Sequence, residues 1–141
     1  MAQGTAALFN EFSEQLARGN HAFATNTYRI KLITTLPVVT QTTPTISDFT
    51  EVSGGSYASV VGTIAISRVN GQTTVDITNN PTWSQDGSGP TNIKAAVIDD
   101  TTANKLVGFI DMTTDNGTTP VSMQAGDVSL TFNASGFLTI G

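Results

Sequence analysis

The sequence contains no cysteine, a single histidine (His21), and only six Lys and Arg residues against eleven Asp and Glu. Without cysteine, disulfide bonds and thiolate-bound metals are excluded, so an apolar core has to supply the stability. The formal net charge of −5 provides no basic stripe for phosphates, which makes nucleic acid a poor partner. One imidazole, no thiol and no GxSxG sequence leave little for nucleophilic catalysis. We therefore expect neither enzymatic activity nor a cofactor.

Long apolar runs are also missing, because no stretch approaches the ~18 residues that a membrane span needs. The first 19 residues lack the basic start and apolar stretch of a signal peptide, so neither membrane insertion nor secretion by that route is expected. The length of 141 residues fits one domain, residues 1–141.

The start of the chain has a helical period, which predicts one helix over residues 5–18. Thr5 is the expected N-cap and Gly19 the expected C-cap. The apolar face of this helix is expected to pack on the chain's own sheet or on a neighbouring subunit. Its members are Leu8, Phe9, Phe12 and Leu16.

From Phe23 onward the apolar period becomes two, as in the stretch TYRIKLIT at residues 27–34, which is typical of strands buried on one face. Asn70-Gly71 between two β-rich runs is a strong hairpin signal. Seven or eight such strands, separated by turn residues, predict a mainly β fold: an antiparallel β-sandwich that carries the short N-terminal helix.

The stretch from residue 93 to residue 112 contains three aspartates, Asp99, Asp100 and Asp111. They raise the question of a metal or acid/base site. The spacing of the acidic residues does not match a calcium-binding loop, and nothing singles out a carboxylate pair for glycoside hydrolysis. Asp99 and Asp100 precede two threonines, which fits a turn. We expect these two residues to cap a β-hairpin and expect no metal site.

Two further features are candidates for partner contact. The segment from residue 36 to residue 49 is rich in threonine and contains two prolines; it is expected to form either a surface loop or an arm that adds to a neighbour's sheet edge. Trp83 lies on a short expected strand, where it belongs to the core, an interface or a sugar-binding platform. The candidate contacts in the segment are Pro37, Val38, Val39, Pro44 and Ile46.

Four stretches, taken in order with Trp83 between the second and third, resemble a widespread group of small structural proteins of tailed bacteriophages. The resemblance covers nearly the whole chain, but the segment at residues 38–49 departs from it. The stretches are LFNEFSEQLARG (8–19), TYRIKLIT (27–34), AVIDDTTANKLVGFIDM (96–112) and VSLTFNASGFLTIG (128–141).

The resemblance implies a virion component without enzymatic activity, and above all a capsid decoration (cement) protein. Such a protein is assembled in the bacterial cytoplasm, binds the outer surface of the shell and ties major capsid proteins together. A trimer would suit this role, because it bridges three neighbours. The alternative is a tail-associated protein of the tube, tip or fibre that contributes to host recognition, with carbohydrate bound near Trp83.

Overall fold

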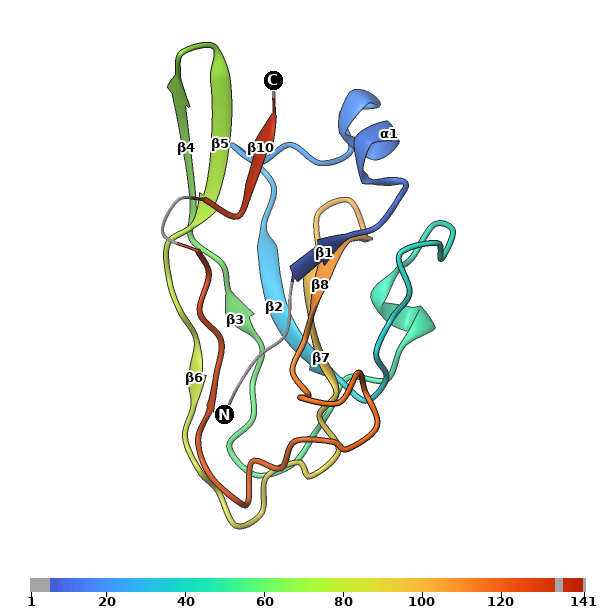
Figure 1. The fold of residues 1–141 in the computed structure, drawn as a ribbon, viewed down its shortest axis with the longest axis vertical. Helices are drawn as coiled ribbons and strands as arrows, with labels where there is room; N and C mark the ends of the chain where they lie inside the picture. Colours follow the sequence, from blue (N-terminus) through green and yellow to red (C-terminus); the bar gives the residue numbers. More distant parts are fainter. Residues whose placement is uncertain (1–5, 134–135, 141) are drawn as a thin grey trace.

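A computed structural model of the chain describes residues 6–133 and 136–140. The fold is mainly β, with antiparallel sheets and one α-helix (Figure 1), as the sequence predicts. The helices are α1 (Phe12–Ala17) and the 3-10 helix η1 (Ile46–Asp48). The strands are β1 (Ala6–Leu8), β2 (Tyr28–Ile33), β3 (Val60–Val61), β4 (Ile64–Val69), β5 (Gln72–Ile77), β6 (Thr82–Trp83), β7 (Ala95–Asp100), β8 (Lys105–Asp111), β9 (Val128–Ser129) and β10 (Leu138–Ile140).

The largest sheet has five strands in the order β1-β8-β7-β2-β3. One face of it packs toward a three-stranded sheet, β10-β5-β4, and a two-stranded sheet, β6-β9. Figure 1 shows these smaller sheets along one side of the molecule and β2, β7 and β8 along the other. The main core between them holds Ile30 and Ile98 from the large sheet, Val75 from β5 and Trp83 from β6.

The opposite face of the large sheet carries a second core, which the chain from residue 34 to residue 50 covers. Leu36, Val39, Ile46 and Phe49 of this segment pack on side chains of the sheet. Because successive strand residues point to opposite faces, both faces of β7 are buried, and none of its six residues is exposed. The sheet residues of the second core are Ile33, Ala95, Val97, Leu106 and Phe109, joined by Phe9.

The predicted helix over residues 5–18 is wrong in its first half. Residues 6–8 form β1, which pairs with Gly108 to Ile110 of β8, and the predicted N-cap lies outside the described residues. A Cβ at Gly108 would collide with the backbone of Ala7, so this glycine permits the close pairing. A short amphipathic helix is only marginally stable, whereas β8 offers unpaired backbone groups along its edge.

The end of the helix follows the sequence prediction. Gly19 has a φ of +81°, which a residue with a side chain rarely adopts. Its N–H donates to the Leu16 carbonyl, and the Asn20 N–H donates to the Gln15 carbonyl, at 3.0 Å each. This pair of bonds is the Schellman motif that ends many helices.

The predicted hairpin at Asn70-Gly71 is also confirmed. Val69 pairs with Gln72 across the turn, and Asn70 and Gly71 have φ values of 52° and 79°. Positive φ at both positions is the signature of a type I′ turn, whose twist matches the strands that it joins.

Candidate docking surfaces

His21 lies inside the molecule, where it exposes only 2% of its surface. Its Nδ1 is 3.0 Å from Oδ2 of Asp100, which also accepts a hydrogen bond from the Asn26 side chain at 2.9 Å. Phe12 stacks on the imidazole with ring centroids 5.5 Å apart. The chain's single imidazole is therefore almost fully enclosed by the chain's own side chains.

The expectation that Asp99 and Asp100 only cap a turn is incomplete. Asp100 does cap the turn, because its Oδ1 accepts the Ala103 N–H at 3.0 Å. However, both aspartates are buried strand residues. Asp99 forms an ion pair with Lys31, with 2.8 Å between Oδ2 and Nζ. The two carboxylates hold neighbouring segments together, which a sequence pattern of turn residues does not reveal.

Two tyrosines lie near carboxylates, the buried Tyr28 and the half-buried Tyr57. The Tyr28 hydroxyl is close to Asp100 without reaching hydrogen-bond geometry, and burial, followed by this negative charge, raises the tyrosine's pKa. The Tyr57 hydroxyl accepts the Leu32 N–H and donates to Glu51. Burial is also the largest cause of the raised pKa of Tyr57. Both hydroxyls therefore stay protonated at neutral pH and serve as structural groups.

No cluster of three or more His, Asp or Glu side chains that could hold a metal occurs within residues 6–133 and 136–140. Over the same ranges, no helix has the length and apolar content of a membrane span.

Trp83 is buried in the main core, which is one of the three placements that the sequence left open, so its ring is not part of the exposed surface of the chain. Only 5% of Trp83 is exposed, and its indole N–H donates to the Ala58 carbonyl at 2.8 Å. Tyr57 packs beside it, with ring centroids 6.2 Å apart. A sugar-stacking platform needs an open ring face, and Trp83 offers none.

The predicted apolar helix face is likewise occupied within the chain. Phe9 belongs to the second core, while Phe12 and the half-buried Leu16 pack on the main core. Leu8 lies on β1 rather than on a helix and remains 37% exposed. Of this group, only Leu8 is available to a partner.

The segment from residue 36 to residue 49 is a folded loop and not a free arm. Its base is closed, because the Thr34 N–H donates to the Thr50 carbonyl at 3.0 Å. The Leu106 N–H donates to the Pro44 carbonyl at 2.9 Å, which ties the loop to β8. Compact loops with adjacent ends and a packed interior are Ω-loops, and we call residues 34–50 the Ω-loop.

The five predicted contacts in the Ω-loop have different environments. Pro37 and Pro44 are buried, whereas Val39 and Ile46 are half-buried against the second core. Val38 is the exception, with 61% of its surface exposed.

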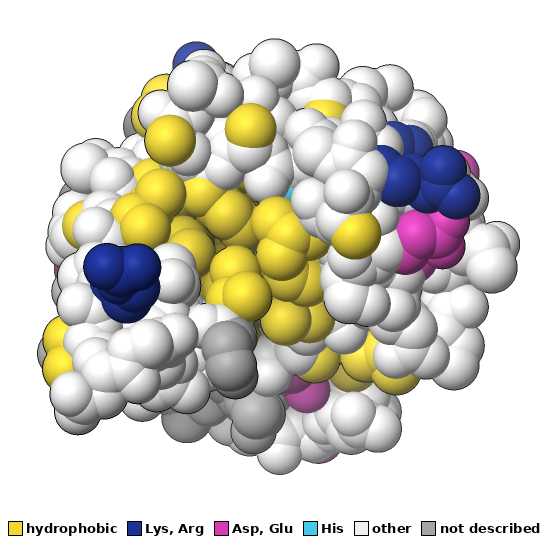
Figure 2. All heavy atoms as spheres, turned by 90° about the horizontal axis from the view of Figure 1, so that it is seen from above, with side chains coloured by type: hydrophobic (Ala, Val, Ile, Leu, Met, Phe, Trp, Pro, Cys, Tyr) yellow, Lys and Arg dark blue, Asp and Glu magenta, His cyan; other side chains and the backbone are white. Residues whose placement is uncertain are grey.

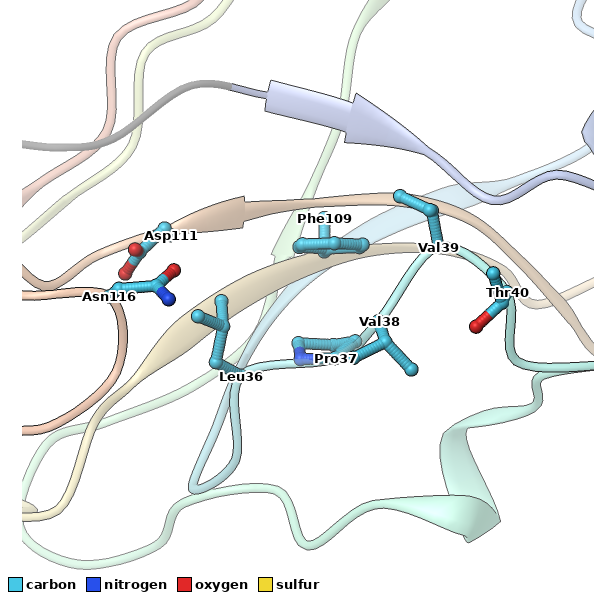
Figure 3. A pocket seen from close by; sticks show the side chains of 8 residues that line it. All are labelled: Leu36, Pro37, Val38, Val39, Thr40, Phe109, Asp111 and Asn116. Carbon is cyan, nitrogen blue, oxygen red and sulfur yellow. The ribbon is translucent and has the colours of Figure 1, made fainter.

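A groove of about 490 Å³ lies between the Ω-loop and the end of β8 (Figure 3). We call it the loop groove. Apolar side chains line most of it, and a carboxylate and a carboxamide lie at one end. Its lining residues are Leu36, Pro37, Val38, Val39, Thr40, Phe109, Asp111 and Asn116.

A second surface is the side of the β10-β5-β4 sheet that continues from the main core, which we call the inner face. The register places Ile66, Val75 and Leu138 side by side on this face. Val75 and Leu138 are buried, but Ile66 is 48% exposed, and Ile140 farther along the same face is 38% exposed. Figure 2 looks down on the end of the molecule with α1 and the β4-β5 turn, and it shows apolar side chains gathered in a hollow.

Sequence reasoning missed Ile66, Ile140 and Asn116, and it considered Asp111 only for a metal or acid/base site or a turn. The alternation in β4 indicates one apolar face, but only the tertiary structure reveals that the core ends before the hairpin does. Comparisons of the chain with protein-family models, curated proteins and solved structures found no match.

Proposed function

We propose that this protein is a non-enzymatic structural component that works by docking against other protein subunits. The observation that carries the proposal is the inner face, where Ile66 and Ile140 extend the apolar surface of the core into solvent. Contiguous apolar surface of this kind commonly marks a protein-binding site. The enclosed pair of His21 and Asp100 supports the absence of catalysis, since it offers no accessible base.

The particular assembly that we propose is the virion of a tailed bacteriophage, with this protein as a capsid decoration protein on the outer shell. The support for this step is the family resemblance of the four sequence stretches. The partner would be the major capsid protein, and self-association as a trimer would bridge neighbouring subunits. Many copies acting together allow each contact to be modest, because avidity adds over the shell. Binding to the assembled shell alone stabilises it by mass action.

The tail-associated alternative has less support than the decoration role, because Trp83, the residue proposed to bind carbohydrate, lies in the core. Copy number separates the two roles. Cryo-electron microscopy of intact virions should place hundreds of copies on the icosahedral shell. A few copies, or a ring along the tail, would contradict the decoration role.

The docking surface is tested by shell binding of the double variant Ile66→Ser with Ile140→Ser. We expect affinity to fall by about tenfold or more, because each buried isoleucine contributes roughly 1.5 to 3 kcal/mol. The matched control is Val69→Ser, since Val69 is 67% exposed on the opposite face of the same sheet. Equal binding by the double variant and the unaltered protein would contradict docking through the inner face.

A further inference from the structure

Asp111 lies at one end of the loop groove, held by a chain of hydrogen bonds. Its Oδ1 accepts the Thr113 N–H at 2.8 Å and the Thr113 hydroxyl at 2.6 Å. The same hydroxyl accepts the Gly117 N–H at 2.7 Å. A carboxylate fixed in this way needs little further ordering when it binds a ligand.

The second oxygen of Asp111 has no partner among the described residues. None of the six Lys and Arg side chains, all of which belong to the described residues, forms an ion pair with Asp111. The Asn116 carboxamide lies beside the carboxylate, as Figure 3 shows. This end of the groove therefore presents one negative charge that no cation of the chain neutralises.

The rest of the loop groove is lined mainly by apolar side chains, with Thr40 at the end opposite Asp111 (Figure 3). Phe109 is buried in the second core, and Leu36 and Val39 pack against that core. The turn that carries Asn116 packs against Leu36, because a Cβ at Gly117 would lie 3.0 Å from the Leu36 Cβ. Val38 borders the groove with most of its side chain in solvent. The volume of about 490 Å³ lies within the range of ligand-binding clefts.

We propose that the loop groove binds a segment of a partner protein in which an apolar side chain is accompanied by a lysine or arginine. The apolar side chain contacts Val38, Val39 and Phe109, and the cation pairs with Asp111. The overall charge of −5 attracts a basic segment during encounter. The proposal rests on the proposed function only in taking the partner to be another protein, and it adds the chemistry of the segment that is recognised.

The test is selection of random seven-residue peptides from a display library on the immobilised full-length protein. We expect the bound peptides to be enriched in Lys or Arg close to a Leu, Ile, Val or Phe. With Asp111→Asn, the apolar preference should remain and the basic preference should disappear. The best basic peptide should bind this variant on the order of fivefold more weakly, as for a partly exposed ion pair. Asn keeps an oxygen that accepts the Thr113 bonds.

Asp115→Asn is the matched control, because it removes the same charge from an exposed position in the same turn region; it should leave peptide binding unchanged. Val38→Ser should weaken binding of all selected peptides. For the unaltered protein, affinity for the basic peptide should fall as salt is raised, a readout that does not depend on a variant folding.

Three results would overturn the proposal: no enrichment of basic residues, no peptide binding at all, or binding that both Asp111→Asn and Val38→Ser leave intact. These outcomes are independent of shell binding through the inner face. Peptide selection can fail while the Ile66 and Ile140 variant still loses shell affinity, and the reverse result is equally distinguishable.

Discussion

The hairpin β7–β8 lies between two layers of side chains, whereas β4–β5 is covered on one face and only along part of its length. Every residue of β7 is buried, and every residue of β4 after Ile64 is exposed. Both hairpins have antiparallel ladders of six paired positions, so backbone pairing does not distinguish them. The difference lies in what the side chains contact: those of β7–β8 are buried in two cores, whereas those of β4–β5 leave apolar surface exposed.

The largest expected difference between the hairpins concerns an isoleucine in each. Ile98 on β7 is 1% exposed, while Ile66 on β4 is 48% exposed. Ile98→Ala should lower the free energy of unfolding by about 2 to 5 kcal/mol, because it leaves a cavity in the main core. Ile66→Ala should cost less than about 1 kcal/mol. Urea unfolding measures both, and equal losses would remove the distinction.

A smaller difference is expected between two aspartates. Asp100→Ala removes the partner of His21, Asn26 and the Ala103 N–H at once, and should cost about 1 to 3 kcal/mol for the buried groups left unpaired. Asp76 lies on β5 opposite the exposed Ala65. Asp76→Ala should change the free energy of unfolding by no more than about 0.5 kcal/mol. Thermal unfolding of the two variants at neutral pH is the measurement. A neutral Asp100→Ala would mean that the buried network adds no stability.

The smallest effect is expected at the tip of the exposed hairpin. Gly71 has a φ of +79°, with open space around the position of a Cβ, so Gly71→Ala should cost about 1 kcal/mol through backbone strain alone. Gly126→Ala is the control, since Gly126 also has open space and its φ lies outside the left-handed region. Denaturant midpoints compare the two, and a neutral Gly71→Ala would show that the turn relaxes without consequence.

Local chemistry was enough to predict several parts of the fold. The Asn70-Gly71 turn, the Gly19 helix end and the alternation in β2 depend on residues that are adjacent in sequence, so the mainly β fold class follows. The first half of the predicted helix failed because β8, about a hundred residues later, offers an edge that residues 6–8 complete. No local pattern contains that partner.

The candidate docking surfaces were only partly predictable for the same reason. The sequence drew attention to Val38 as a contact in a loop, and to Asp111 as a turn residue or a metal or acid/base candidate. It did not place the two residues in one site. Their place in one groove depends on how the Ω-loop folds over β8. For Trp83 the sequence left the core, an interface and a sugar-binding platform open, because a lone tryptophan among short strands has the same pattern in each case. Only the neighbours that bury it place it in the core.

The closed base of the Ω-loop gives it a degree of independence from the rest of the domain. Because Thr34 and Thr50 are already bonded to each other, a change of length between them adds little loop-closure cost. The stability of the sandwich depends only on those side chains of the loop that cover the second core. The exposed positions around Val38 can change without loss of stability. The length and the exposed sequence of this loop can therefore change at little cost to the stability of the sandwich.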